Sequence, residues 1–383
     1  MPKVKAWKHV VTELSLLDAV ARCNLEEVAA MAKLRLQWST DEITIAANLV
    51  EARRRAVGKL ESAETIVADP VGVQQATSTA IASHKATRFA GCDNIVDLCC
   101  GIGSDLQALP HRTIGVDIDP LRCWMAQMNT QKEVRCADAT SYGLPQSCVV
   151  HIDPSRRDVS GKRLHLDELT PSFSEVLSIA SHCEGGCIKL SPGIDPEDVD
   201  AIDQPTEIEY IEENNRVVQA VVWFGSLAHN GGKITATSMT HGETMTDEPL
   251  RVPFAPSIGA WLLEPNAALE RSGLHGTYAT HIGAHEAAPN LGLLFTDERP
   301  SSRWCTPFEV LETTPLRLAK VATALRELGC TQVEVKTRNQ TVDPNFWQKQ
   351  LSSYPHGPLL TVFALRLGKK RIAVITRRHS ADT

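Results

Sequence analysis

Four aspartates follow short apolar runs in the first half of the chain, and their spacing points to nucleoside binding. Asp97 lies at the end of one such run, and Asp117 follows it by 20 residues. Asp138 and Asp153 come after the next two runs. An acidic side chain at the position of Asp117 can accept hydrogen bonds from both ribose hydroxyls, and Asp138 could meet an adenine amino group. Together these positions predict a nucleoside pocket.

The turn after Asp97 indicates which nucleoside the pocket binds. Gly101 and Gly103 allow a sharp turn and a close approach of the backbone to a ligand. A dinucleotide-binding turn would carry a third glycine three positions later, where this chain has Leu106. Asp97 and Asp105 flank the glycines and would repel a pyrophosphate. They suit the ammonium and sulfonium of S-adenosylmethionine (SAM), so the charge pattern favours SAM over a nicotinamide dinucleotide.

A mainly parallel sheet must position these aspartates. The expected strands are Ile95–Cys99, Thr113–Val116, Glu133–Cys136, Val149–Ile152, Gly186–Leu190, Thr206–Ile211 and Val217–Trp223. Helical or loop segments separate the first five, which is the alternation of a parallel sheet covered on both faces. Only Glu212–Arg216 separates the last two, so they should form an antiparallel hairpin. The four aspartates then lie at carboxyl ends of strands, where open α/β sheets bind ligands.

The rest of the chain divides into further regions. We predict a helical region over residues 1–74, with N-caps at Thr12, Asn24 and Ser39 and an end at Asp69-Pro70. The core spans residues 75–228 and begins with a helix over Thr77–Phe89. A mixed, β-rich extension covers residues 229–304, and a small α/β module covers 305–383.

The amino-acid composition indicates what class of protein this is. The chain has 383 residues, of which 43% are hydrophobic and 22% charged, as in a soluble globular protein. Its apolar runs are too short to cross a bilayer, and no signal peptide is readable, so we expect a cytoplasmic protein. The eleven cysteines are interpreted as reduced, mostly buried thiols. His275, His281 and His285 have no carboxylate at a zinc-site spacing, so no metal site is expected.

These motifs resemble those of class I SAM-dependent methyltransferases. The resemblance rests on Asp97 through Gly103, Asp117 through Pro120, Asp138 and Asp153-Pro154. More closely, the segments 97–105, 153–157 and 189–193 resemble a bacterial group of methyltransferases with a C-terminal THUMP-like domain, and the core is similar to trimethylguanosine synthases. The resemblance implies a Rossmann-like α/β fold with an antiparallel terminal hairpin, an N-terminal helical region and a small C-terminal module.

The resemblance also implies roles for individual residues. Those expected to bind the amino-acid part of SAM are Asp97, Gly101 and Gly103. Asp117 would bind the ribose, Ile118 would pack on the adenine, and Asp138 with Ala139 would lie at the adenine amino group. The remaining cofactor candidates are Thr77, Cys99, Asp105 and Asp153.

The expected catalytic residues are Asp153, Pro154, Arg156 and Arg157. Enzymes that methylate base amines often carry a second proline and an aromatic residue here, and this chain has neither. Asp153 could bind an acceptor amine and later take its proton. Either arginine could stack on a base, pair with a phosphate or carboxylate, or form an internal ion pair.

A second loop, Lys189–Asp195, should open onto the same cleft. Lys189 could contact a phosphate or neutralise nearby buried acids, and both interpretations stay open. Ser191 and Asp195 are weaker candidates. Neither this loop nor Asp153–Arg157 contains a cysteine nucleophile, which argues against methylation of carbon.

The uneven distribution of charge along the chain indicates which class of substrate the protein binds. The chain carries a net charge of −7, yet residues 306–383 hold twelve lysines and arginines against six acids. Lys369–Arg371 and Arg377-Arg378 flank an apolar strand and could form a basic rim, which suits tRNA or rRNA. The leading hypothesis is methylation of an RNA base amine. The alternatives are a small-molecule or protein acceptor, a non-catalytic SAM-binding protein that interacts with RNA, and ordinary solvation of the rim.

Overall fold

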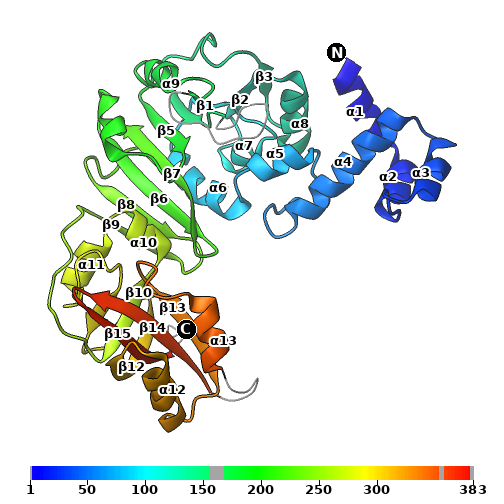
Figure 1. Ribbon diagram of the computed structural model, residues 1–383. Helices are drawn as coiled ribbons and strands as arrows, with labels where there is room; N and C mark the ends of the chain where they lie inside the picture. Colours follow the sequence, from blue (N-terminus) through cyan, green and yellow to red (C-terminus); the bar gives the residue numbers. More distant parts are fainter. Residues whose placement is uncertain (1, 156–167, 353–357, 380–383) are drawn as a thin grey trace. The chain divides into compact units, whose positions relative to one another are not determined.

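The computed structural model describes residues 2–155, 168–352 and 358–379. The chain forms two compact units (Figure 1). The first comprises Met1–Ile208 with Ala220–Gly232, and the second comprises Glu209–Gln219 with Lys233–Thr383. No helix within the described ranges is long and apolar enough to cross a membrane.

Four helices form the N-terminal region: α1 Pro2–Thr12, α2 Leu14–Ala21, α3 Val28–Arg35 and α4 Thr40–Ala56. Ser39 caps α4 in a reciprocal capping box with Glu42, which confirms the predicted start of that helix. The predictions at Thr12 and Asn24 are wrong. Thr12 is the last residue of α1, and α3 begins only at Val28 because Asn24 instead accepts a hydrogen bond from a nearby turn.

The first seven strands of the first sheet agree with the predicted ones to within a few residues, and β8 and β9 extend the sheet into the region predicted as a separate extension. The strands are β1 Ile95–Leu98, β2 Ile114–Asp117, β3 Val134–Cys136, β4 Val149–Ile152, β5 Gly185–Leu190, β6 Thr206–Glu213, β7 Arg216–Gly225, β8 Ile234–Ser238 and β9 Glu243–Asp247. The strand order is β3-β2-β1-β4-β5-β7-β6-β8-β9. The first five strands pair in parallel, and β7 runs antiparallel to β5. The expected Rossmann-like α/β sheet is therefore confirmed.

The helices around this sheet are short. They are α5 Pro70–Gln75, α6 Thr79–Ala86, the 3-10 turn η1 Thr87–Phe89, α7 Ser104–Ala108, α8 Pro120–Thr130, α9 Phe173–Ala180 and the 3-10 turn η3 Pro196–Ala201. The predicted helix over Thr77–Phe89 is present as α6 and η1. Asp69-Pro70 does not end the helical region, because the Asp69 carboxylate caps α5 and Pro70 occupies its first turn.

The N-terminal helices share a hydrophobic core with α8 and with the turn that follows β1. Leu49 of α4 and Trp7 of α1 are buried in the same cluster as Trp124 and Met125 of α8 and Ile102, which follows Gly101. The first helices are thus packed into the methyltransferase-like core rather than attached to it by a linker.

A second sheet lies in the second unit. Its strands are β10 Trp261–Pro265, β11 Leu294–Thr296, β12 Cys305–Pro315, β13 Gln332–Thr337, β14 Leu359–Leu367 and β15 Lys370–Arg378, in the order β11-β10-β12-β15-β14-β13. Two short helices, α10 Ala267–Arg271 and α11 His275–His281, precede β11. The sheet thus takes strands from both sides of residue 305.

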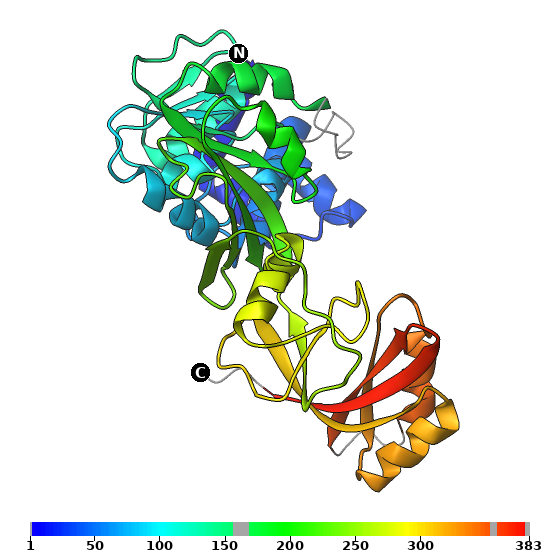
Figure 2. The ribbon, with the colours of Figure 1, turned by 90° about the vertical axis from the view of Figure 1, so that its left-hand side faces the viewer.

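Two helices cover one face of this second sheet. α12 Leu318–Glu327 and α13 Pro344–Leu351 lie on the same side of it (Figure 2). Val321 of α12 and Leu351 of α13 are buried with Val335, Val362 and residues of β15. Phe308 and Phe363 belong to a separate cluster with residues from 262–295. Each face of the second sheet is therefore covered by its own apolar cluster.

Candidate active site

A cavity of about 510 Å³ lies at the carboxyl ends of the parallel strands. Ten of the predicted site residues line it: Asp97, Cys99, Gly101, Asp105, Asp117, Ile118, Asp138, Ala139, Asp153 and Pro154. Thr77 and Gly103 do not line it, although both lie directly behind residues that do. Arg156 and Arg157 fall outside the described residues.

The two glycines of the turn have different physical roles. Gly101 has a φ of +56°, and a Cβ there would meet no atom within 4 Å. Its amide N–H donates to Oδ2 of Asp117 at 2.9 Å, which ties the turn to the end of β2. Gly103 has a φ of +87°, and a Cβ there would lie 2.8 Å from Cγ2 of Thr130 on α8. Gly103 therefore permits close packing of α7 against α8 rather than contact with a ligand.

The end of β2 presents a carboxylate and an apolar side chain to the cavity. Each oxygen of Asp117 accepts a backbone N–H, one from Gly101 and one from Asp119. Burial raises the pKa of Asp117. Ile118, next to it, is 67% exposed although it is a large apolar residue. An exposed isoleucine at a cavity wall suits the face of a planar ring.

The residues after β3 form the far end of the cavity. Asp138 is exposed, and its Oδ1 accepts hydrogen bonds from the amide and the hydroxyl of Thr140. The backbone bond from Thr140 is the main reason that the pKa of Asp138 is lowered. Ala139 is buried beside it. This end can therefore offer an ionised carboxylate to a donor group.

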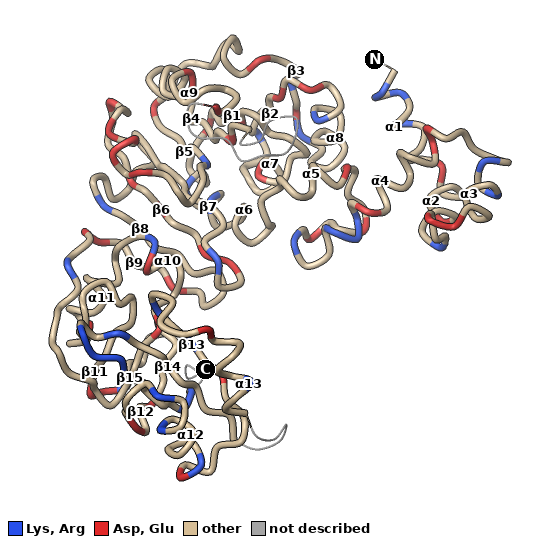
Figure 3. Tube along the Cα trace, in the orientation of Figure 1, with Lys and Arg blue, Asp and Glu red and all other residues tan. Residues whose placement is uncertain are grey.

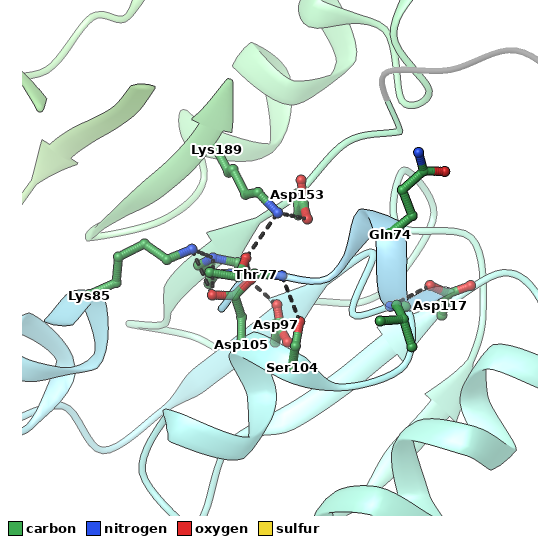
Figure 4. Close-up of polar contacts among 12 residues, drawn as sticks. Gln74, Thr77, Lys85, Asp97, Ser104, Asp105, Asp117, Asp153 and Lys189 are labelled. Carbon is green, nitrogen blue, oxygen red and sulfur yellow. Dashed lines mark hydrogen bonds and ion pairs between the residues drawn. The ribbon is translucent and has the colours of Figure 1, made fainter. Parts of the chain in front are cut away.

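A chain of buried polar side chains lies behind the cavity (Figure 4). Nδ1 of His151 lies 2.7 Å from Oδ1 of Asp97, and Nε2 of the same ring lies 2.9 Å from Nζ of Lys85. Lys85 also forms an ion pair with Asp105 at 2.7 Å. Asp97, His151 and Lys85 are at most 1% exposed. Such groups are retained in an interior only when they are paired and hydrogen-bonded.

The series of polar contacts continues from Asp105 to Asp153, in the loop after β4. The hydroxyl of Thr77 donates to Oδ2 of Asp105 at 2.6 Å and accepts from Nζ of Lys189 at 3.0 Å. Lys189 in turn donates to Oδ2 of Asp153 at 2.6 Å. Of the two open interpretations of Lys189, the structure supports the neutralising one, because its ammonium is 4% exposed and pairs with a carboxylate.

Burial and neighbouring charge shift these groups in opposite directions. Burial raises the pKa of Asp97, and the bond from His151 only partly offsets this effect. Burial alone would also raise the pKa of Asp105, but nearby positive charge, chiefly that of Lys85, outweighs this effect and holds that pKa well below its usual range. Burial would lower the pKa of Lys85, yet its pairing with Asp105 raises it. Lys85 and Asp105 are therefore a charged pair at neutral pH.

Two known proteins are similar to most of this chain. Two uncharacterised SAM-dependent methyltransferases from two strains of Mycobacterium tuberculosis are each 31% identical over 339 residues, covering 85% of this chain and 93% of theirs. The chain belongs to the SAM-dependent methyltransferases. Residues 305–378 match the family described as THUMP domain-like.

A solved structure agrees with the fold of this methyltransferase. A candidate methyltransferase from Porphyromonas gingivalis W83 superposes with a TM-score of 0.72 at 18% identity, covering 90% of this chain and 92% of that one. At this identity the likeness establishes the fold alone.

The cavity fits the cofactor of the methyltransferase family. Oδ2 of Asp97 is buried and has no hydrogen-bond partner among the described residues. Because Asp97 lines the cavity, this oxygen can accept a donor from a ligand there, such as the ammonium of SAM. Asp117 and Ile118 then lie where a ribose and an adenine would follow. SAM supplies the activated methyl group of the reaction.

Sequence reasoning missed one wall of the methyltransferase cavity. Gln74 and Gln75 of α5 line it, and α5 is held by a bidentate ion pair in which Nη2 of Arg122 lies 2.9 and 3.0 Å from the two oxygens of Asp69. The sequence did contain a signal for the start of α5, because aspartate followed by proline is typical of a helix start. Lys85 and His151 were also missed, because a single lysine in a helix and a single histidine in an apolar run carry no signature.

Proposed function

We propose that this methyltransferase transfers the methyl group of SAM to an exocyclic amino group of a base in RNA. The observation that carries the proposal is the carboxylate of Asp153 at the cavity, held by Lys189 at 2.6 Å. The acceptor nitrogen must lie in line with the methyl group, so positioning provides most of the rate. The N–C bond forms as the S–C bond breaks, and the product nitrogen then loses one proton.

Asp153 can serve both needs of an amine acceptor. Its Oδ2 accepts from Lys189, and its Oδ1 has no partner within residues 2–155, 168–352 and 358–379, so it can accept an N–H from the acceptor. The side chain is 25% exposed, so a proton taken from nitrogen can pass to water. Pro154, buried next to it, would restrict the conformation of the loop.

The second unit supports RNA as the carrier of that amine. The turn between β14 and β15 carries Arg366, Lys369, Lys370 and Arg371, all exposed, and Figure 3 shows them as a blue run. Arg366 and Arg371 are direct cross-strand partners. Like charges placed opposite each other destabilise a sheet, so such a cluster suits contact with a polyanion. The THUMP domain-like match covers this turn.

A small cationic acceptor is the second candidate. Among the described residues that line the cavity, seven are acidic, and the basic ones are Arg122 and Lys189 with His151. Glu175, at the start of α9, lies at the cavity with Asp153. This excess of acid favours an amine and opposes entry of a phosphate.

Tritiated methyl transfer separates the two candidates. The protein is incubated with labelled SAM and total RNA from cells lacking the gene, and in parallel with their small-molecule and protein fractions. We expect label in RNA, which Asp153→Asn abolishes. The matched control is Asp195→Asn, because Asp195 caps η3 and does not line the cavity. Label confined to the small-molecule fraction would replace the first candidate with the second.

A further inference from the structure

Lys85, His151 and Asp97 form a buried line of polar contacts from α6 across β4 to β1. The register of the parallel pair β1–β4 places Asp97 directly beside His151. His151 contacts Asp97 at 2.7 Å and Lys85 at 2.9 Å. Neither His151 nor Lys85 is needed to close the sheet, and apolar residues at both positions would avoid the cost of burying polar groups. Their presence therefore calls for a role at the cavity.

The chemistry of the donors fixes the protonation of the His151 ring. A lysine ammonium has three N–H donors and cannot accept a hydrogen bond. Nε2 of His151, facing Lys85, must therefore be the acceptor, and the ring proton resides on Nδ1. Nδ1–H then donates to Oδ1 of Asp97. Lys85 itself is held by Asp105, so its position does not depend on a ligand.

A neutral ring orients Asp97 without cancelling its charge. A lysine or arginine paired directly with Asp97 would fix the carboxylate but would also neutralise it. Here one oxygen, Oδ1, accepts from the imidazole. The other, Oδ2, is buried at the cavity with no hydrogen-bond partner in the described part of the chain. The carboxylate is thus held in one orientation and keeps its negative charge for a cation.

We infer that Lys85 and His151 are positioning residues for the cofactor: Lys85 sets the tautomer of His151, and His151 directs the second oxygen of Asp97 to the ammonium of SAM. This inference rests on the proposed placement of that ammonium at Asp97. Lys85 does not line the cavity, and His151, which does, acts through Asp97. Their effect should therefore be confined to ligands that carry the ammonium.

Two ligands isolate this effect. S-adenosylhomocysteine has the amino-acid group, whereas 5′-methylthioadenosine has the same nucleoside and sulfur without it. We expect His151→Leu to weaken the binding of S-adenosylhomocysteine by about tenfold or more, because a hydrogen bond to a charged group is lost. Titration calorimetry measures this affinity. Binding of 5′-methylthioadenosine should stay within about twofold of wild type, since no ammonium contact is lost.

Two further variants complete the test. His151→Asn keeps an N–H donor near the position of Nδ1 and should restore most of the selectivity for S-adenosylhomocysteine. Lys132→Met is the matched control for Lys85→Met. Lys132 is another buried lysine of the first unit, and its ammonium donates to the backbone carbonyls of Leu106 and Leu109. Lys85→Met should lower the ratio of the two affinities, and Lys132→Met should leave it unchanged.

The possible results have separate meanings. If His151→Leu weakened the binding of both ligands equally, the inference would be overturned and His151 would be a structural residue. If Asp97→Asn leaves the ratio of the two affinities unchanged, the placement of the ammonium itself fails. Should the variants not fold, nitrogen-15 spectra of the wild-type histidines decide the matter. A proton on Nδ1 of His151 supports the inference, whereas a proton on Nε2 overturns it.

Discussion

Nζ of Lys189, at the end of β5, lies 2.6 Å from Oδ2 of Asp153, in the loop after β4. The contact joins two neighbouring strand ends at the cavity, and Oδ1 of Asp153 has no partner in the described part of the chain. In the proposed reaction the acceptor enters beside this pair, so loss of the pair should affect turnover more than cofactor binding.

Lys189→Met should reduce methyl transfer by about tenfold to a hundredfold, the range expected when a catalytic carboxylate loses its orientation. The dissociation constant of S-adenosylhomocysteine should change by less than about threefold, because Asp97 and Asp117 keep their contacts. Single-turnover rates and calorimetry on the same variant measure the two quantities. An equal loss in both would place Lys189 in the cofactor site instead.

The two glycines of the cofactor turn should respond differently to alanine. Gly103→Ala adds a Cβ 2.8 Å from Thr130 and should lower the free energy of unfolding by about 2–4 kcal/mol, from strain at positive φ and overpacking. In Gly101→Ala the added Cβ has no neighbouring atom within 4 Å. This variant should lower the free energy of unfolding by about 1–2 kcal/mol, from the strain of a positive φ alone. Urea denaturation of both variants gives the comparison. A smaller loss for Gly103→Ala would contradict the packing argument.

Affinity for S-adenosylhomocysteine should fall as the pH is lowered. Burial raises the pKa of both Asp97 and Asp117, so each begins to bind a proton at a higher pH than an ordinary carboxyl, whose pKa is about 3.9. Since the ligand's ammonium needs the ionised form of Asp97, binding weakens as the pH falls toward these raised values. Calorimetry between pH 8 and pH 5 should show the loss, and Asp97→Asn should flatten it.

The stability that Asp105 contributes should also be lost as the pH is lowered. Burial opposes its ionisation, but Lys85 and the other nearby positive charges lower its folded pKa well below the unfolded value. Its stabilising contribution is therefore complete above the unfolded pKa of about 3.9 and is lost as the pH falls below it. Acid-unfolding curves of wild type and Asp105→Asn should converge at low pH. Curves that remain parallel would show that Asp105 is not the group responsible.

The β14–β15 turn should carry a share of RNA affinity. The variant with Lys369→Gln, Lys370→Gln and Arg371→Gln should bind RNA more weakly, with a salt slope smaller by about 2–3. The matched control also removes three charges, from the exposed residues Lys320 and Arg326 of α12 and Lys349 of α13. Filter binding at several salt concentrations compares the two. Equal losses would show a general charge effect rather than a site at the turn.

The strands of the first sheet and the cofactor class were predictable from the sequence because both depend on local patterns. Apolar runs ending in Asp97, Asp117 and Asp153 define the strands, and parallel pairing brings their ends together. The partners of these aspartates were not predictable. Lys85 precedes His151 by 66 residues, and only the packing of α6 against the sheet brings their side chains together. Nothing local distinguishes Lys85 from a solvated lysine of an ordinary helix.

Asn129, on α8, accepts the amide N–H of Val67 and donates its own side-chain N–H to the carbonyls of Val67 and Ile102. Ile102 belongs both to the cofactor turn and to the core formed with the N-terminal helices. The turn after β1, where we place the cofactor, is therefore not an independent folding unit. Local unfolding of the first helices would release Ile102 and dismantle the turn with it, so hydrogen exchange in α4 should slow when S-adenosylhomocysteine binds.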